Sequence, residues 1–319
     1  MHGREYRTGF SAILLLGSIE QREKGRTMKN NRFVACVLIP SVIFLLIFAV
    51  FPVVYGLGIS LYDYNPTSSY NEFLGLENYK RLLTDEVFWK AVKNTIIFCV
   101  VAVTANIVIT LFLAKIISAL PSKGMKTLFR TILFIPCIAP MVGTSMVWKY
   151  GIVGTDGGLL NRILGLAGIP PRNWFLTTWQ LLAIIIIYTL WADIGYNVVL
   201  FTAGIEGVPK EFDEAAAIDG AGPIRRFVSI KLPLMGRTFA FVAIMTMANY
   251  FQMFAQFQVF APDGGRSNSA MVLTNYIYKT SFSSYDMGYA SAVAAALFII
   301  VFIVAMIQNK MMHADWSYE

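Results

Sequence analysis

Charged side chains are scarce in this sequence. Only 14% of its 319 residues are Asp, Glu, Lys or Arg, whereas 56% are hydrophobic. Soluble domains usually carry about 25% charged residues, so roughly half the usual complement is missing. The composition argues against an ordinary soluble protein and directs attention to long uncharged runs.

Histidine, cysteine and phosphate-binding loops are also rare or missing. The only histidines, His2 and His313, lie near the two ends, which argues against a histidine-based catalytic or zinc site. Cys36, Cys99 and Cys137 each stand alone in an apolar run. They are predicted to be buried small hydrophobic side chains rather than metal ligands or a disulfide. No Gly-Lys dipeptide occurs, so the chain has no Gly-x-x-x-x-Gly-Lys phosphate loop.

Six uncharged runs are long enough to cross a bilayer. A helix needs about 20 residues, with a range of about 17–25, to span the hydrocarbon core. Because lipid cannot satisfy backbone amides, these runs should be helical. They are Phe33–Leu61, Asn94–Ala114, Thr131–Trp148, Asn173–Ala192 with its continuation past Asp193 to Ile205, Thr238–Pro262 and Met287–Asn309. The predicted fold class is an all-α integral membrane protein with six transmembrane helices.

Lysine and arginine are concentrated in three segments, which are residues 1–32, the loop 115–131 and the loop 206–237. Cytoplasmic segments of membrane proteins carry the excess of these residues. Both termini are therefore predicted to be cytoplasmic, in a multi-pass protein of the plasma membrane. The net charge of +7 is interpreted as this bias plus contact with anionic lipid, rather than as a sign of nucleic-acid binding.

The predicted organisation is one membrane domain with short flanks. It consists of a cytoplasmic arm over 1–32, a transmembrane domain over 33–310 and a cytoplasmic tail over 311–319. Residues 1–27 are interpreted as an upstream extension or a disordered arm, because Met28-Lys-Asn-Asn-Arg directly precedes the first span.

Prolines interrupt two of the predicted spans. Pro40 and Pro52 fall in the first, and Pro136 and Pro140 in the third. Each removes a helix hydrogen bond and should bend its helix. The bends serve either packing geometry or a hinge that opens a pathway to alternate sides.

The loop 206–237 predicts two helices joined by a turn. Pro209 suits a first helical position, and three acids follow it where a helix N-terminus favours negative charge. Glycines stop this helix just before Pro223 opens the next one, and Pro233 is predicted to end it. The small side chains of 215–217 would let the backbone of another protein approach closely. The alternative is a solvated hairpin with no partner.

The order of residues in this loop matches a known signature. Glu-Ala-Ala, three residues, Gly, nine residues and Ile-x-Leu-Pro resembles the signature loop of binding-protein-dependent ABC importer permeases. The defined positions are Glu214, Ala215, Ala216, Gly220, Ile230, Leu232 and Pro233, with Asp219 directly before the glycine. Other stretches resemble the carbohydrate-uptake branch, among them Gly75–Tyr79, Phe88–Thr95, Ala203–Pro209 and Tyr276–Tyr278.

The resemblance implies an ABC importer type I permease fold and a mechanism. The loop would dock into a groove on a cytoplasmic ATPase and transmit its closure to the membrane helices. It also implies a second permease as heterodimer partner, two ATPase subunits that bind the ATP, and an external solute-binding protein. Gly264-Gly265 is followed by Arg266, where sugar permeases often carry proline. This departure leaves an acidic sugar, a glycerol phosphate or a peptide open as cargo beside a sugar or oligosaccharide.

Polar residues inside the predicted spans are candidates for the substrate path, because such groups are costly in lipid. They are Asp193, Asn197, Asn249, Tyr250, Gln252 and Gln256. Asn249, Gln252 and Gln256 fall within a narrow arc at about 100° per residue, which favours cavity lining for this trio. For the others, cavity lining and interhelical hydrogen bonding, worth about 0.6 kcal/mol per contact, remain equal alternatives. In the path, amides and carboxylates would hydrogen-bond to sugar hydroxyls, and Tyr250 would stack on a pyranose face.

Two rival function classes lack sequence support. A secondary transporter or channel would need ion-coupling charges, a filter loop or inverted repeats, and Asp193 is the one acid expected to be buried. An intramembrane enzyme would need paired acids, or histidine with glutamate, inside the spans. Enzymatic activity is therefore not expected.

Overall fold

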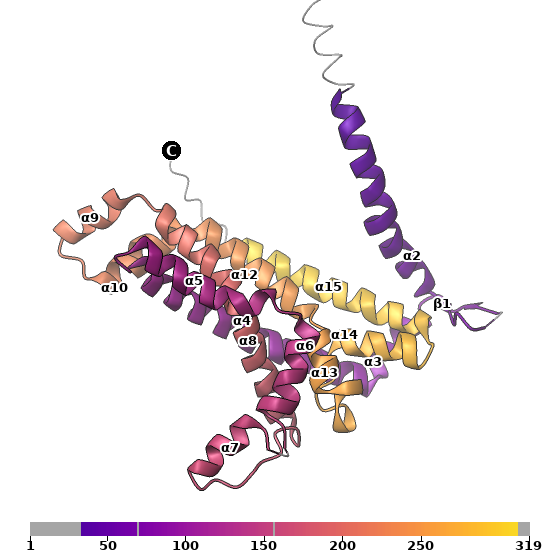
Figure 1. The fold of residues 1–319 in the computed structure, drawn as a ribbon. Coiled ribbons are helices and arrows are strands. Elements are labelled where there is room, and N and C mark those ends of the chain that lie inside the picture. Colours follow the sequence, from indigo (N-terminus) through magenta and orange to yellow (C-terminus); the bar gives the residue numbers. More distant parts are fainter. Residues whose placement is uncertain (1–32, 69, 156, 312–319) are drawn as a thin grey trace, which may run out of the picture. The chain divides into compact units, whose positions relative to one another are not determined.

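The computed structural model describes residues 33–68, 70–155 and 157–311 (Figure 1). They form two units, of which one ends at Gly58 and the other begins at Ile59. The expectations for the arm over 1–32, its start at Met28 included, lie outside the described residues.

The first unit is a single apolar helix within the span Phe33–Ile59. The α-helix continues unbroken past Pro40 and then widens into the π-helix η1 (Leu46–Val50), which precedes α2 (Phe51–Ile59). Pro52 lacks an amide hydrogen, and its ring crowds the carbonyl four residues earlier. A wider turn beside it accommodates both effects. The helix is locally widened before Pro52 and the helical pattern does not break at Pro40, and the bends predicted at these two prolines stay predictions.

The second unit is a bundle of long helices. These are α4 (Glu86–Ser118), α5 (Lys123–Ile138), α8 (Thr178–Gly207), α12 (Gly236–Phe251) and α15 (Met287–Met311). The shorter helical segments are α3 (Glu77–Thr84), α6 (Met141–Met146), η2 (Val147–Ile152), α7 (Leu159–Leu166), α9 (Lys210–Ile218), α10 (Pro223–Arg226), η3 (Phe227–Lys231), α11 (Leu232–Leu234), α13 (Ala255–Phe260), η4 (Pro262–Gly264), η5 (Arg266–Asn268), α14 (Leu273–Tyr278) and η6 (Lys279–Ser283). Two short strands, β1 (Tyr62–Asp63) and β2 (Glu72–Phe73), pair antiparallel.

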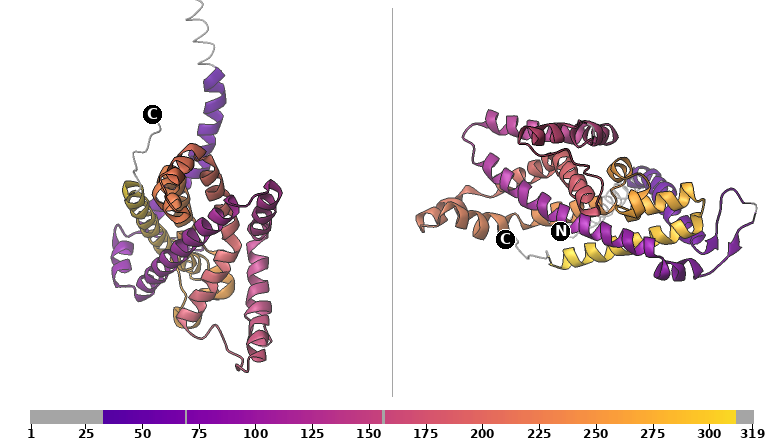
Figure 2. Two further views of the ribbon diagram at one scale, coloured as in Figure 1. Left: turned by 90° about the vertical axis from the view of Figure 1, so that its left-hand side faces the viewer. Right: turned by 90° about the horizontal axis from the view of Figure 1, so that it is seen from below.

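The long helices run side by side, so that the bundle has two ends (Figures 1 and 2). Helices α9 and α10 lie at one end, and α3 and α14 lie near the other. Among the described residues, five helical stretches are long and apolar enough to cross a membrane, and a bent pair of helices would make a sixth. The all-α membrane fold predicted from the uncharged runs is confirmed.

The third predicted span is sharply bent. Its two halves, Lys123–Ile138 and Met141–Ile152, meet at 89°. Between them Ala139 is extended, with φ −71° and ψ 141°, because the ring of Pro140 disfavours α-helical backbone in the residue before it. Pro136 removes one further hydrogen bond from the end of α5. The predicted bend is therefore confirmed.

The core is built on α4 and α8, with side chains of α12, α13, α14 and α15 packed into the same buried cluster. Cys99 is fully buried there, as predicted, whereas Cys36 is exposed on the first-unit helix and the prediction of its burial is wrong. Helix α8 also approaches α5 very closely. A Cβ atom at Gly195 would lie 2.1 Å from the carbonyl oxygen of Leu133, so only glycine allows this contact.

A polar cluster ties α3, α4, α14 and α15 together at the end away from α9. The Asp85 carboxylate caps α4 and accepts hydrogen bonds from the hydroxyls of Tyr276 and Tyr289. Arg81 pairs with Asp286 at 2.7 Å and stacks over the ring of Tyr289. Desolvation raises the pKa of the Asp85 carboxyl, but hydrogen bonds from both tyrosines and two backbone amides outweigh it, so this pKa lies below its ordinary value. The cluster holds the helix ends in a fixed arrangement.

Candidate functional site

The hairpin over residues 206–237 has the helix–turn–helix form that its sequence predicts. Helix α9 begins directly after Pro209 and carries two acids in its first turn, where the helix dipole stabilises them. Gly220 follows the helix with φ +78°, a left-handed conformation that glycine adopts without a Cβ penalty. The next amide, that of Ala221, donates to the carbonyl of Ala216 at 2.9 Å. The turn is thus closed by backbone hydrogen bonds.

The second helix of the hairpin differs from prediction at its far end. It opens at Pro223, as predicted. The prediction that Pro233 ends it is wrong, because the chain stays helical to Leu234 and breaks at Met235, where φ is −93° and ψ is 18°. The π-helix η3 directly precedes this proline. Its wider turn relieves the clash that would otherwise end the helix at Pro233.

The inner face of α9 is held by two bases of the second helix. Asp213 forms ion pairs with Lys231 at 3.1 Å and with Arg226 at 3.6 Å. Arg226 also donates to the Asp213 carbonyl at 3.5 Å, and Ala216 is buried on the same face. These contacts hold the two helices of the hairpin together.

The other signature residues divide into an exposed group and a root group. Glu214, Ala215, Asp219 and Gly220 are exposed, and the neighbouring Ile218 is 87% exposed. The root residues Ile230, Leu232 and Pro233 are half-buried. The first part of the signature, on α9 and the turn after it, is thus exposed, and its last part, near Pro233, is half-buried.

The root is joined to three long helices through a small apolar cluster. Leu232 and Phe227 pack against Met235, which directly precedes α12, and against buried side chains of α4, α8 and α12, which are Ala114, Phe201, Ile205 and Val242. A displacement of the hairpin would therefore reach the bundle through direct side-chain contacts.

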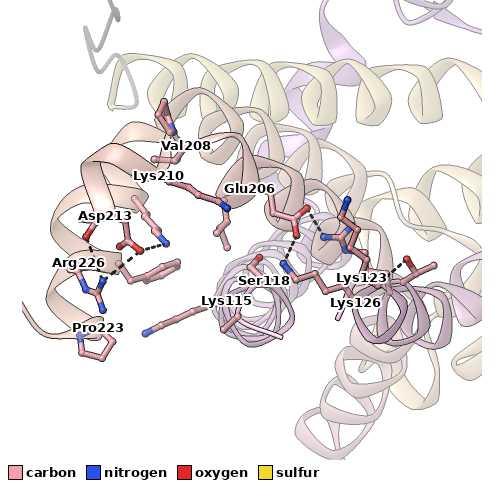
Figure 3. A pocket seen from close by; sticks show the side chains of 17 residues that line it. Lys115, Ser118, Lys123, Lys126, Glu206, Val208, Lys210, Asp213, Pro223 and Arg226 are labelled. Carbon is pink, nitrogen blue, oxygen red and sulfur yellow. Dashed lines mark hydrogen bonds and ion pairs between the residues drawn. The ribbon is translucent and has the colours of Figure 1, made fainter. Parts of the chain in front are cut away.

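A cavity of about 600 Å³ lies between the hairpin and the adjacent ends of α4, α5 and α8 (Figure 3). Glu206 on its wall pairs with Lys126 at 3.2 Å and with Arg130 at 2.8 Å. These ion pairs connect the end of α8 to α5. The basic loops are evident in the sequence, but their convergence on one site is not, since it depends on how the helices pack.

Three of the substrate-path candidates, Asp193, Asn197 and Tyr250, lie in one hydrogen-bond network. Asn197 of α8 donates to Asn106 of α4 at 2.7 Å and to Thr246 of α12 at 2.9 Å. Asn106 in turn donates to the hydroxyl of Tyr250 at 2.8 Å, which also interacts with Asp193. The network joins three helices. Thr246 is not among the predicted path residues, although a threonine one turn before Tyr250 in an uncharged run is a usable signal.

The trio on the fifth span does not share a continuous helix. Helix α12 ends at Phe251 and α13 begins at Ala255, so the single arc expected from a regular helix is interrupted. Asn249 and Gln252 are exposed, whereas Gln256 is buried. Neither polar atom of the Gln256 amide has a hydrogen-bond partner among the described residues.

Comparison with known proteins places these features in a family. Residues 13–314 match the family model described as "Binding-protein-dependent transport system inner membrane component". The multiple sugar-binding transport system permease protein MsmF of Streptococcus mutans is 32% identical over 291 residues, which cover 90% of this chain and 97% of that protein. The arabinooligosaccharides transport system permease protein AraP of Halalkalibacterium halodurans is 28% identical over 88% of this chain and 87% of its own length.

A solved structure has the same fold. The bacterial alginate ABC transporter, in complex with an alginate pentasaccharide-bound periplasmic protein, contains a chain that superposes with a TM-score of 0.79 at 20% identity. The match covers 90% of this chain and 96% of that one. The signature hairpin, the helical bundle and the family match agree: the chain belongs to the family of binding-protein-dependent transport system inner membrane components, with the type I permease fold of ABC importers.

Proposed function

We propose that this chain is the permease subunit of an ABC importer that moves a sugar or oligosaccharide across the plasma membrane, with both termini cytoplasmic. The observation that carries this proposal is the hairpin at one end of the bundle. Its inner face is held by the Asp213 ion pairs, while Glu214, Ala215, Asp219 and Gly220 face outward.

The exposed face of α9 is the surface on which a cytoplasmic ATPase subunit docks. Small side chains at Ala215 and Gly220 allow close approach, and Glu214 offers a carboxylate to a basic group of the partner. Closure of the ATPase moves the hairpin, and the apolar cluster at its root passes the movement to α4, α8 and α12. ATP is bound and hydrolysed by the partner, and this chain performs no catalysis.

The complete importer contains a second permease as heterodimer partner, two ATPase subunits and an external solute-binding protein. The alginate transporter provides a parallel, since its structure was determined with a sugar-loaded periplasmic protein.

A carbohydrate cargo is supported by the names of relatives that carry arabinooligosaccharides, lactose and multiple sugars. In the path that we propose, Asp193, Asn249, Gln252 and Gln256 offer carboxylate and amide groups to sugar hydroxyls. Gln256 is the most specific candidate, because its buried amide lacks a partner among the described residues and buried amides normally bond. Asn197 and Tyr250 hold α4, α8 and α12 in place around this path through their hydrogen-bond network.

The test is transport by reconstituted vesicles. The chain is co-expressed with a second permease and an ATPase subunit of the same importer, and uptake of labelled oligosaccharides is measured with the solute-binding protein and ATP. Uptake that requires all components is expected. Vesicles with this chain alone are the control, and ATP-independent transport by them would refute the proposal. Labelled glycerol 3-phosphate, the cargo of two further relatives by name, serves as competitor and is expected not to reduce sugar uptake.

A further inference from the structure

The cavity beside the hairpin carries an unusual concentration of positive charge. Seven of its lining residues are basic, and only two, Glu206 and Asp213, are acidic. The bases are Lys115, Lys123, Lys126, Arg130, Lys210, Arg226 and Lys231. They come from separate elements, so the charge results from the fold and not from one basic run of sequence.

The two acids do not neutralise this charge. Each acid already forms ion pairs with two bases. Glu206 pairs with Lys126 and Arg130, and Asp213 pairs with Arg226 and Lys231. The other three bases, Lys115, Lys123 and Lys210, form no ion pair within the described ranges. Lys115 lies instead 4.9 Å from the centre of the Phe227 ring. Like charges gathered around one cavity repel each other unless an anion joins them.

Hydrogen-bond donors in the cavity wall are also left over. The Nε atoms of Arg130 and Arg226 and the hydroxyl of Ser118 are buried without a partner in the part of the chain that the structure describes. Buried polar groups are normally bonded to protein or to a bound species. Both arginines have guanidinium groups suited to bonding an oxyanion through two nitrogens at once.

Two helices begin at the same cavity. The 16-residue α5 starts at Lys123 and the nine-residue α9 starts at Lys210, and neither has a side-chain hydrogen bond at its N-cap. The first amides of such helices carry a partial positive charge, which favours phosphate in particular. The helix starts add to a site that the bases and the unbonded donors already define.

We propose that this cavity binds a phosphate group. The anion would be shared between the ends of α4 and α5 and the hairpin, so that it braces α9 against the bundle. Two sources carry this chemistry: the head group of an anionic phospholipid, for which basic pockets between transmembrane helices are suited, and a soluble phosphate compound. Binding itself does not depend on the proposed transport function, whereas any effect on coupling does.

The experiment measures binding to the purified full-length chain in a zwitterionic detergent. One arm titrates short-chain phosphatidylglycerol against phosphatidylcholine, and the other titrates pyrophosphate against chloride at constant ionic strength. Hydrogen–deuterium exchange of residues 115–131 and 206–237 reports the site. Saturable protection of both segments is expected in at least one arm, and the arm that shows it identifies the source.

Substitutions test whether binding occurs in this cavity. Combining Lys115→Gln with Lys210→Gln removes two bases that have no carboxylate partner among the described residues, and it should weaken binding by roughly tenfold or more, about 1.4 kcal/mol. Arg225→Gln is the matched control, because Arg225 is an exposed base of the same hairpin that does not line the cavity. Absence of saturable protection in both arms overturns the proposal, and so does an equal loss of affinity in the control.

Discussion

Replacing Gly220 by alanine isolates the role of the turn at the tip of the hairpin. Gly220 has φ +78°, and a Cβ atom built on it would meet no atom within 4 Å. Within this chain the substitution therefore adds backbone strain without a steric clash, and any direct obstruction of the docking partner by the methyl group would add to the effect. An L-residue in the left-handed region costs roughly 1–2 kcal/mol, which lowers the population of the native turn relative to other turns by a factor of about 5–30.

Gly222 supplies the matched control. A Cβ atom there would also lie in open space, but its φ of −67° suits any residue, so Gly222→Ala should have no strain cost. The assay is the affinity of the ATPase subunit for the permease pair, measured in detergent. If docking needs the native turn, Gly220→Ala weakens it by up to the population factor of about 5–30, whereas Gly222→Ala leaves it unchanged. Equal affinities of the two variants would refute the docking role of this turn.

Three further predictions concern the bundle. Gly195→Ala would place a methyl group 2.1 Å from a backbone carbonyl of α5 and should lower thermal stability by about 1–3 kcal/mol or more, whereas Gly143→Ala, which has open space, should not. Asn197→Leu removes two interhelical hydrogen bonds and should lower the free energy of unfolding, measured by detergent titration, by roughly 1–2 kcal/mol. Asn249 lies at an exposed position, so an equal effect of Asn249→Leu would contradict the role of the network. The pKa of Asp85 is depressed in the folded chain. The stabilisation from its ionised carboxylate is therefore present above about pH 4 and is lost as the pH falls through the folded-state pKa. The thermal midpoint should fall more steeply below about pH 4 in the native chain than in Asp85→Asn, and parallel curves would contradict this.

The membrane spans were predictable because lipid imposes a simple rule on length and polarity. Their ends were less so. Helix α4 begins at Glu86, eight residues before the uncharged run at Asn94, since a helix can continue into water with charged residues on it. The bend at Pro140 was anticipated from proline chemistry, whereas the break between Phe251 and Ala255 contains no proline or glycine to signal it.

The local form of the hairpin was predictable and the contacts between helices were not. Pro223 and Gly220 act on their own neighbours, so their effects can be inferred from the sequence alone. The partner of Asn197 depends on how α4 and α8 pack, which no spacing along one helix determines. The same holds for the basic cavity, whose members lie up to 116 positions apart, from Lys115 to Lys231.

The π-helix before Pro233 has a consequence for the direction in which α9 points. Relative to an ordinary helix, η3 contains one surplus residue within its turn. Removing that residue would rotate everything beyond it by about 100° around the helix axis, and the carboxylate of Glu214 would then face a different side of the molecule. The number of residues between Gly220 and Pro233 therefore determines the direction in which α9 points as well as its distance from Pro233. A one-residue deletion in this interval should misalign the hairpin even though every signature side chain remains.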